Sequence, residues 1–458
     1  MKMKILSTLL TLTIAASAIA QEQEQETYNF NLQECIEYAL DNSYEIKNAA
    51  LDVQIARRQV KETVGIGLPQ VNGEVSYMNN FAIQTVFLPA IFFADDPNAV
   101  PADAPPVPVR FGVQHTGSAG LNISQLIFDG SYLVGLQAAN TYQDLSRRSK
   151  EATEEEIASN VMKAYYGVMI SKERLYLMQV NFNRLDTLLQ ETRIMQDNGF
   201  AEQIDVDRIK LNYNNIVAEM ENTKRVLALN YALLKFQMGM GIDQTLLLEG
   251  SLDDFEFEPY DIDLLEDSLQ FNKRKDYMVA QTQLELEKLD LKNNIVANYP
   301  KLNGFFGFGY NSGTDTFGEL TNFSDNWFNY GNFGATLSIP IFSGMQRHNR
   351  IQMARLDVKK AENNIFAFEN LILQQIAQAK TDYNNALNSL QATRENMELA
   401  ERIFNVTKEK NQAGVGSNFE VVEADTDYKE SETNYYSSFY DVLISKVDLE
   451  KALGILEY

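Results

Sequence analysis

A stretch of 69 residues without proline or glycine, from Met345 to Ala413, constrains the fold of this chain more than any other feature. A second stretch, residues 131–198, also lacks proline and contains only Gly135 and Gly167. A continuous helix of this length would reach ~100 Å, because each residue adds ~1.5 Å. No compact globule accommodates such a helix, so both stretches predict a coiled-coil rod or the wall of a tube.

Each long helix is predicted to end at a glycine turn and to be followed by a shorter helix. The turns are placed at Asn198-Gly199 and at Gly414-Val415-Gly416, and the return helices run to about Gly239 and Gly454. Gly199, Gly414 and Gly416 are interpreted as residues that allow a positive φ in a tight turn. The sequence therefore predicts two helical hairpins.

The chain also repeats itself. Residues 120–130 recur as 334–344 at an offset of 214, and the region 199–239 recurs as 414–454 at an offset of 215. An offset that holds through strand, helix and turn predicts a tandem duplication. The predicted organisation is a signal peptide (1–20), a first repeat (21–240), a connector (241–260) and a second repeat (261–458).

A helix and two strands are predicted ahead of each hairpin. The leading helices run from about Leu32 to Glu62, where Asn31 and Glu34 have capping-box spacing, and from about Ile262 to Val296. Apolar and polar residues alternate in the four predicted strands, 71–77, 121–127, 302–310 and 333–341. This alternation is typical of membrane barrel strands, and a half-buried soluble hairpin is the alternative that it leaves open.

Two connecting segments carry further predictions. The segment from about Asn79 to His115 holds six of the ten prolines and is interpreted as an irregular, exposed loop. The connector contains strand-like runs at 246–248 and 255–257.

The first residues have the features of an export signal. Lys2 and Lys4 precede an apolar run over residues 5–19, and Ala18-Ile19-Ala20 is a small-x-small cleavage site. A membrane anchor is the alternative, but the run is shorter than the ~20 residues that a spanning helix needs. No later segment is apolar for long enough to be a membrane helix, so a membrane-crossing form of this chain must use β-strands in a barrel.

Charge and residue counts exclude several classes of function. Asp and Glu total 63 against 39 Lys and Arg, which gives a formal net charge of −24 and disfavours nucleic acid as a partner. Cys35 is the only cysteine, so an intramolecular disulfide and a Cys-rich zinc site are impossible. The two histidines, His115 and His348, lie in different repeats without ligand spacing. These features predict no catalytic residue, no cofactor and no metal site.

The order of elements, the duplication and the local motifs resemble the TolC-like outer-membrane efflux family over nearly all of the chain after residue 20. The most specific motifs are two turns of the form Gly-x5-acid-Val, at Gly199 with Asp205-Val206 and at Gly414 with Glu420-Val421. The resemblance implies an α+β membrane protein in which three copies each give four transmembrane β-strands to one twelve-stranded barrel. A long α-helical coiled-coil barrel would continue it through the periplasm.

The resemblance further implies a passive exit duct of a tripartite efflux or type I secretion system in the outer membrane of a Gram-negative bacterium. The implied partners are two further copies of the chain, outer-membrane lipid, a periplasmic adaptor and an inner-membrane pump. A soluble periplasmic coiled-coil scaffold or adaptor is the alternative, but an adaptor should carry one hairpin rather than two. Drugs, metal ions and secreted polypeptides all fit such a duct as cargo.

By resemblance, the entrance of the duct lies at the helical turns. Glu420 and Glu423 fall where the family has two acidic residues around the pore constriction, Asp205 matches the acidic turn position of the first repeat, and Asp207 is nearby. Three copies would gather six carboxylates from Glu420 and Glu423, and such rings attract cations. A solvated helix start, favoured by the helix dipole, is the alternative interpretation.

The same turns are where the resemblance places adaptor docking, at Gly199, Gly414 and Gly416. The family can carry a Tyr and an Arg at two positions of this region, where they close the entrance through hydrogen bonds. This chain has Asn411 and Gly416 there, so a different contact must hold a closed state.

Overall fold

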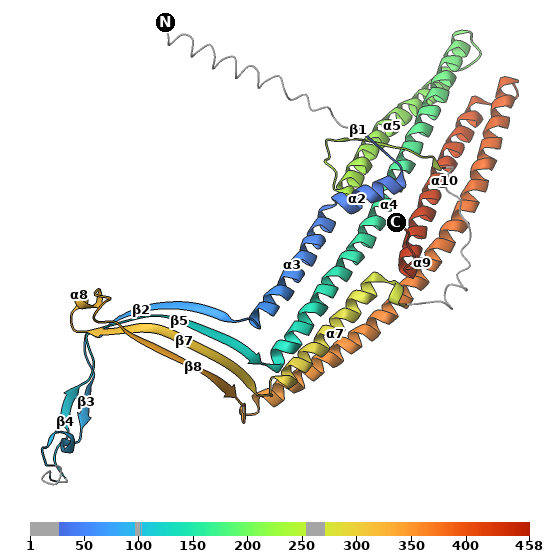
Figure 1. Ribbon diagram of the computed structural model, residues 1–458. Coiled ribbons are helices and arrows are strands. Elements are labelled where there is room, and N and C mark those ends of the chain that lie inside the picture. Colours follow the sequence, from blue (N-terminus) through green and yellow to red (C-terminus); the bar gives the residue numbers. More distant parts are fainter. Residues whose placement is uncertain (1–26, 97–100, 102, 253–270) are drawn as a thin grey trace, which may run out of the picture. The chain divides into compact units, whose positions relative to one another are not determined.

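The computed structural model describes residues 27–96, 101, 103–252 and 271–458 (Figure 1). The predicted signal peptide and residues 261–270 of the predicted second repeat lie outside this part of the chain. The chain divides into two units, here called the helical unit and the sheet unit. The helical unit combines residues 1–53, 145–281 and 363–458, and the sheet unit combines residues 54–144 and 282–362.

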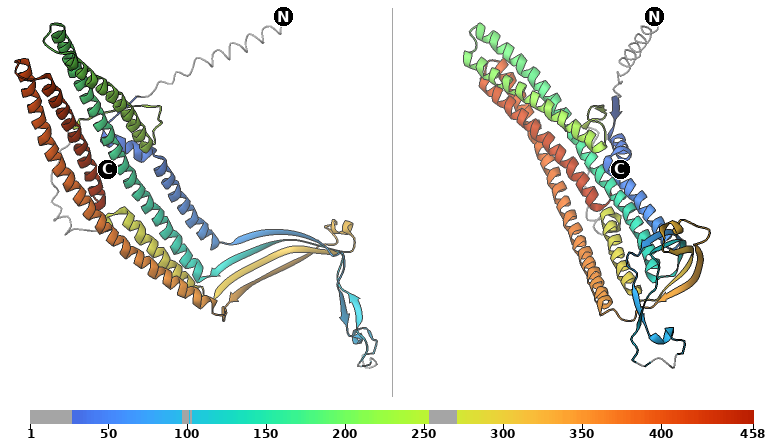
Figure 2. Two further views of the ribbon diagram at one scale, coloured as in Figure 1. Left: turned by 180° about the vertical axis from the view of Figure 1, so that it is seen from behind. Right: turned by 90° about the vertical axis from the view of Figure 1, so that its left-hand side faces the viewer.

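Two helical hairpins, whose long helices begin in residues of the sheet unit, dominate the helical unit (Figure 2). The first consists of α4 (Gly130–Asp197) and α5 (Gln203–Met238), and the second of α9 (Gln346–Gln412) and α10 (Asn418–Leu453). The two long helices and their return helices are therefore confirmed. Both return helices end at a left-handed glycine, Gly239 with φ 71° and Gly454 with φ 69°, because only a residue without a Cβ adopts this conformation without strain.

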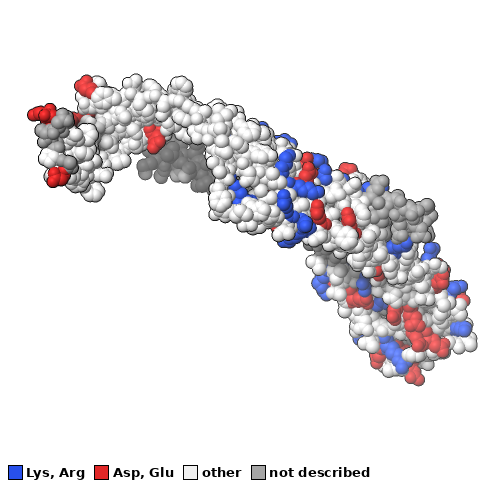
Figure 3. All heavy atoms as spheres, turned by 90° about the horizontal axis from the view of Figure 1, so that it is seen from below, with Lys and Arg blue, Asp and Glu red and all other residues white. Residues whose placement is uncertain are grey.

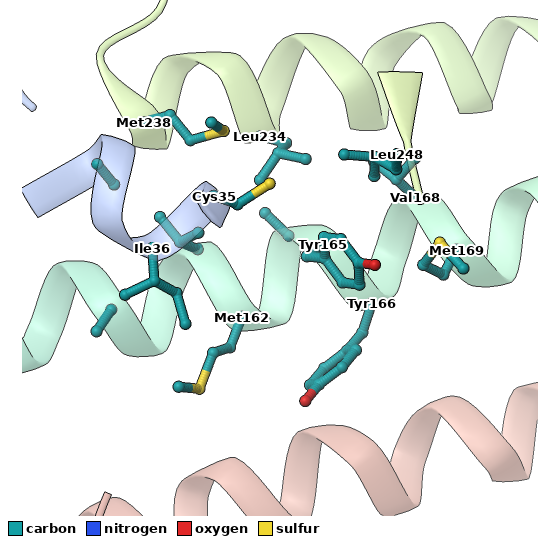
Figure 4. Close-up of a cluster of buried hydrophobic side chains, with 14 of the residues drawn as sticks. Cys35, Ile36, Met162, Tyr165, Tyr166, Val168, Met169, Leu234, Met238 and Leu248 are labelled. Carbon is teal, nitrogen blue, oxygen red and sulfur yellow. The ribbon is translucent and has the colours of Figure 1, made fainter. Parts of the chain in front are cut away.

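The largest core cluster of the helical unit gathers around α2 (Leu32–Asn42). Figure 4 shows its side chains converging from α2, α4, α5 and the strand β6. Cys35 lies inside this cluster and is fully buried, as a small apolar residue would be. Burial raises the pKa of its thiol to about 12, so the thiol is inert at neutral pH.

The leading helices differ from the prediction in their bounds. The capping box is confirmed, because the Glu34 backbone N donates to Asn31 Oδ1 over 3.0 Å and the Asn31 backbone N donates to Glu34 Oε2 over 2.8 Å. The single helix predicted to Glu62 is wrong: Ser43 is extended at ψ 135° and separates α2 from α3 (Tyr44–Ile66). In the second repeat α7 begins only at Lys275 and ends at Val296, after a 3-10 turn at Phe271–Lys273.

A short parallel strand pair lies beside the core of the helical unit. β1 (Thr27–Phe30) pairs with β6 (Thr245–Leu248) in the predicted connector. The strand-like run at 246–248 is thus confirmed, and the run at 255–257 lies outside the described residues. β1 was not predicted, although Tyr28 and Phe30 alternate with polar residues there.

One antiparallel four-stranded sheet, in the order β2-β5-β7-β8, forms the centre of the sheet unit. Its strands are β2 (Gln70–Asn79), β5 (His115–Phe128), β7 (Lys301–Thr314) and β8 (Phe328–Ser338). The four predicted strands exist, but the extension through residues 339–341 is wrong. β8 ends at Ser338 because Pro340 has no N–H to donate to the ladder.

The strand register separates apolar from polar side chains. Val71, Ile123, Phe306 and Phe333 are opposite one another across the four strands and lie on one face. The adjacent row lies on the other face and consists of Asn72, Asn122, Gly307 and Asn332. We call these the apolar face and the polar face of the sheet.

Charged side chains are scarce in the sheet. In its four described strands, Glu74 and Lys301 are the only Asp, Glu, Lys or Arg residues. On the side of the molecule seen in Figure 3, acidic and basic side chains gather over the helices and leave the strands almost uncharged. None of the helices in the described part of the chain has the length and hydropathy of a membrane-spanning helix.

The proline-rich segment between β2 and β5 is only partly irregular. β3 (Thr85–Leu88) and β4 (Val107–Arg110) pair as an antiparallel ladder, which corrects the prediction of a loop without strands. Pro108 sits inside β4 opposite Phe87. A two-stranded ladder tolerates it because each strand has one open edge that needs no donor.

Candidate entrance site at the helical turns

The two hairpin turns have the same backbone construction. In the first, Gly199 has φ 80° and the Phe200 N–H donates to the Met195 carbonyl over 2.8 Å. In the second, Gly414 has φ 76° and the Val415 N–H donates to the Lys410 carbonyl over 3.0 Å. Both are Schellman motifs, in which a left-handed residue lets the last helical carbonyls find donors. The positive φ predicted for these two glycines is confirmed.

Gly416 behaves differently from the prediction. Its φ is not positive, because Gly414 already makes the left-handed step of the turn. A Cβ at Gly416 would lie 3.2 Å from the Asn411 backbone N, so the chain approaches the end of α9 closely there. Asn411 Nδ2 donates to the Gly416 carbonyl oxygen over 3.1 Å. The two positions that the resemblance singled out thus contact each other within one turn.

The acidic residues of the two turn motifs occupy the same helical position and play different local roles. Asp205 is the third residue of α5, and its Oδ2 accepts from the Glu202 N–H over 3.2 Å. Glu420 is the third residue of α10, and its backbone N–H donates to Ser417 Oγ over 3.2 Å. The Asp205 carboxylate is therefore one half of a capping box with the N-cap residue Glu202, whereas the hydroxyl of the N-cap residue Ser417 caps the other helix.

The valine of each motif anchors the turn in the core. Val206 is buried against Leu189 and Ile209, within the first hairpin. Val421 is buried against Phe404 and Ala424, within the second. The Gly-x5-acid-Val pattern thus encodes a left-handed turn, a helix start and a buried anchor in succession.

The other predicted acidic residues lie on the surface. Glu420 and Glu423 are both exposed, and their spacing of three residues puts them on one side of α10. Asp207 is exposed on α5, where its Oδ1 accepts from Gln203 Nε2 over 2.9 Å. In the part of the chain that the structure describes, no group of three or more His, Cys, Asp or Glu side chains is placed to hold a metal ion.

Two exposed apolar side chains at the turns were not predicted. Phe200 is 86% exposed and Val415 is 82% exposed, and each directly follows the left-handed glycine of its turn. In a Schellman motif this position commonly packs back on its own helix, so the outward placement leaves apolar surface uncovered. The signal was present in the sequence as a large apolar residue next to a turn glycine.

A buried polar cluster, not predicted either, joins the two hairpins further along the helices. Arg184 of α4 forms an ion pair with Asp425 of α10, with Nε 2.6 Å from Oδ1. Arg184 Nη2 also donates to Asn181 Oδ1 over 2.6 Å, and Asn181 Nδ2 donates to Glu432 Oε2 over 3.4 Å. The guanidinium carbon of Arg184 lies 4.8 Å from the ring centre of Phe404 on α9. We call Asn181, Arg184, Asp425 and Glu432 the interhairpin cluster.

The interhairpin cluster buries more negative than positive charge. Burial raises the pKa of Asp425 above its usual range, although Arg184 and Lys429 act to lower it. Burial likewise raises the pKa of Glu432, against the lowering effect of hydrogen bonds from Tyr428 and Asn181. Sequence reasoning had no signal for this cluster, because its partners are more than 240 residues apart in the chain.

The comparison with protein families decides the identity of the chain. The family model described as "Outer membrane efflux protein" matches residues 35–225 and again residues 271–455. The chain belongs to this family. Outer membrane protein TolC of Escherichia coli (strain K12) is 20% identical over 440 residues, which cover 93% of this chain and 82% of that protein. TolC of Vibrio cholerae serotype O1 is 19% identical over 339 residues, which cover 74% of this chain and 77% of that protein.

Solved structures share the fold of this outer membrane efflux protein. CusC superimposes with a TM-score of 0.73 at 16% identity and covers 95% of each chain. The outer membrane channel CmeC of Campylobacter jejuni superimposes with a TM-score of 0.72 at 17% identity, covering 95% of this chain and 90% of that one. The predicted resemblance to TolC-like proteins is therefore confirmed, together with a helix-rich fold that includes a sheet.

Family membership also fixes the general role. The protein is an exit duct of the outer membrane of a Gram-negative bacterium. Its relatives are channels rather than enzymes. The alternative of a soluble periplasmic scaffold is not favoured.

Proposed function

We propose that this outer membrane efflux protein works as a homotrimer in which each copy gives the β2-β5-β7-β8 sheet to one shared barrel. The observation that carries the proposal is the sheet itself, which has one apolar face and two open edges, β2 and β8. Open edges are not tolerated in lipid, so the sheet must continue into another copy.

The strand count supports three copies. Neighbouring strands of the sheet are all antiparallel, so β8 of one copy runs antiparallel to β2 of the next and can extend the ladder. Two copies would give about eight strands, an interior that side chains fill. Three copies give about twelve strands and leave an open lumen, with the apolar face toward lipid and the polar face toward the lumen.

Cysteine cross-linking tests this arrangement. Within one chain β2 and β8 are three strand spacings apart, about 14 Å, which is too far for a disulfide. A cysteine at Val75 of β2, in a Cys35→Ala background, is combined with single cysteines along β8. The β8 positions on the same face are Asn329, Gly331, Phe333, Ala335 and Leu337.

Oxidation should convert at least one pair into a covalently linked trimer on a denaturing gel. A chain with Val75→Cys alone is the control and should stay monomeric on that gel. A monodisperse monomer in detergent that keeps its full β content would overturn the proposal.

We further propose that the helical turns form the periplasmic entrance, with Glu420 and Glu423 attracting cations there. The exposure of both carboxylates and their position next to the Gly414 turn support this role. Asp205 and Asp207 belong to the same entrance, where Asp205 also caps its helix.

Bilayer recordings test the entrance. Glu420→Gln with Glu423→Gln should weaken cation selectivity and block by multivalent cations added from the periplasmic side. The matched control is Glu395→Gln with Glu398→Gln, an exposed acidic pair of the same spacing on α9, about 25 Å from the turn at ~1.5 Å per residue. Equal selectivity and block in both double variants would favour the solvated helix start instead.

The turns at Gly199, Gly414 and Gly416 are proposed to dock the periplasmic adaptor, which passes cargo from an inner-membrane pump. The uncovered side chains of Phe200 and Val415 support this, because exposed apolar groups at a tip suit a protein partner. A photo-cross-linking residue at position 200 or 415 should capture a protein with a helical hairpin and lipoyl-like segments. The same label at the exposed Val180 of α4 should not.

The domain organisation remains a proposal as well: two repeats, 21–240 and 261–458, joined by a connector at 241–260. The two separate matches of the family model, 35–225 and 271–455, support it. So does the parallel construction of the two hairpin turns.

A further inference from the structure

On the polar face of the sheet, an aromatic ring lies over a glycine of the neighbouring strand. Phe305 of β7 is directly opposite Gly334 of β8. A Cβ at Gly334 would lie 2.7 Å from Phe305 Cζ and 3.1 Å from Cε1. The ring therefore crosses the backbone at Gly334, although strand side chains ordinarily stand perpendicular to the sheet.

Two more side chains on this face, one aromatic ring and one amide, also lie over glycines of the neighbouring strand. Tyr330 of β8 is opposite Gly309 of β7, and Gly309 is opposite Gly120 of β5. The Tyr330 hydroxyl would lie 3.0 Å from a Cβ at Gly309 and 2.9 Å from a Cβ at Gly120. Asn332 is opposite Gly307, and its Oδ1 would lie 2.5 Å from a Cβ there. Three successive side chains of the polar face thus lie along the sheet in places that only glycine leaves open.

The rings are covered on one side only. Phe305 is 43% exposed and Tyr330 is 40% exposed, so one side of each ring rests on the strands and the other is open. Each glycine forms a recess, because a Cβ in its place would push the overlying side chain away from the backbone. The recesses therefore keep these side chains close to the strand backbone, so that they project little from the polar face.

We propose that the recesses at Gly334, Gly307 and Gly309 set the width available to bulky cargo within the sheet section of the duct. They do so by holding Phe305, Asn332 and Tyr330 flat against the wall. The inference rests on the proposed function, in which the polar face lines the lumen. It makes these residues determinants of the open width of that section.

Gly334 offers the cleanest test. The atom that a new Cβ would meet is the far end of the Phe305 ring, which can swing. The strand backbone lies beneath the ring, so the ring can move only away from the sheet. Gly309 is unsuitable, because a Cβ there would meet the Ala119 carbonyl oxygen at 2.6 Å and the Gly120 Cα at 2.8 Å, and backbone cannot yield.

Gly334→Ala should lower single-channel conductance by roughly a tenth or more, since three raised rings narrow one level of a barrel of about twelve strands. It should also lower the size limit for neutral polymers added to the bilayer chamber. The matched control is Gly331→Ala, three residues away in β8 and on the apolar face. A Cβ there would meet the Gly307 oxygen and Phe308 Cδ2 at an ordinary 3.6 Å, so conductance should not change.

A rescue variant separates narrowing from general damage. Phe305→Ala should restore conductance in the Gly334→Ala background and change little alone. If Gly334→Ala fails to insert, Gly307→Ala with and without Asn332→Ala repeats the test, because the contact there is also with side-chain ends.

The outcomes distinguish this inference from the proposed function. Wild-type protein that forms neither an oligomer nor a channel overturns both. A wild-type channel whose conductance and polymer limit are unchanged by Gly334→Ala, or are not restored by Phe305→Ala, overturns the inference alone.

Discussion

The two hairpin turns have the same backbone and different chemistry. Both use a left-handed glycine, a Schellman motif and a buried valine. In the first turn the Asp205 carboxylate is part of a capping box with Glu202, and in the second the Ser417 hydroxyl caps α10. The second hairpin therefore does not need the Glu420 carboxylate for its cap, which leaves that carboxylate available for ions at the entrance.

The largest effect is expected from removing the ion pair that joins the two hairpins. Arg184→Leu removes the cation that forms the ion pair with Asp425, so the buried carboxylates of Asp425 and Glu432 lose its charge. We expect a loss of about 3 kcal/mol of stability, measured by thermal or denaturant unfolding in detergent. Arg193→Leu, an exposed position on the same helix, is the control. Equal stability of the two variants would show that the interhairpin cluster does not contribute to the free energy of unfolding.

A smaller effect is expected from the valine anchors. Val421→Ala and Val206→Ala each remove a buried side chain and should each cost about 2 kcal/mol of local stability. Amide hydrogen exchange at the starts of α10 and α5 would measure it. Val415→Ala, at an exposed position, should leave exchange unchanged. Protection that falls in only one hairpin would contradict the equivalence of the two motifs.

Substitutions of the residues that cap the two helices should distinguish the two turns. Asp205→Ala removes one hydrogen bond of the capping box and should weaken the start of α5 by about 1 kcal/mol. Ser417→Ala removes the N-cap side chain and should weaken the start of α10 by a similar amount. Glu420→Ala should cost only a few tenths of a kcal/mol through the helix dipole. Amide hydrogen exchange at the two helix starts measures these losses. A large loss of protection in Glu420→Ala would assign Glu420 a structural role like that of Asp205.

The smallest effect concerns pH. Burial raises the pKa of Glu432, so the folded chain binds this proton more tightly than the unfolded chain does. Its contribution to stability is thus full below the ordinary carboxyl pKa of ~4.3 and is lost as pH rises through the raised pKa. The melting temperature of Glu432→Gln should therefore fall less than that of wild type as pH rises above ~4.3. Identical slopes would contradict the raised pKa.

Much of the fold follows from the sequence, because its signals are local. The absence of proline and glycine from residues 345–413 fixes a long helix, and Gly414 fixes where it turns. Alternation of apolar and polar residues identifies four strands. The bounds depend on single residues that the patterns overlook, such as Ser43 between α2 and α3 and Pro340 after β8.

The candidate site was predictable in position and only partly in role. The two turn motifs locate Asp205 and Glu420 at equivalent helix starts, but the side chain that caps each helix emerges from the hydrogen bonds. Gly416 shows the same limit, since the sequence marks a glycine without saying whether φ or close approach requires it. The local sequence is compatible with a positive φ at this glycine and with a close approach of the backbone.

The contacts between distant segments were decided by the tertiary structure alone. Arg184 meets Asp425 because two hairpins lie side by side, and Phe305 meets Gly334 because two strands share a register. A sequence pattern records which face of a helix or strand a residue occupies, but not which residue of another element comes opposite. By itself this sequence determined the elements, the turns and the family, and packing decided which side chains meet.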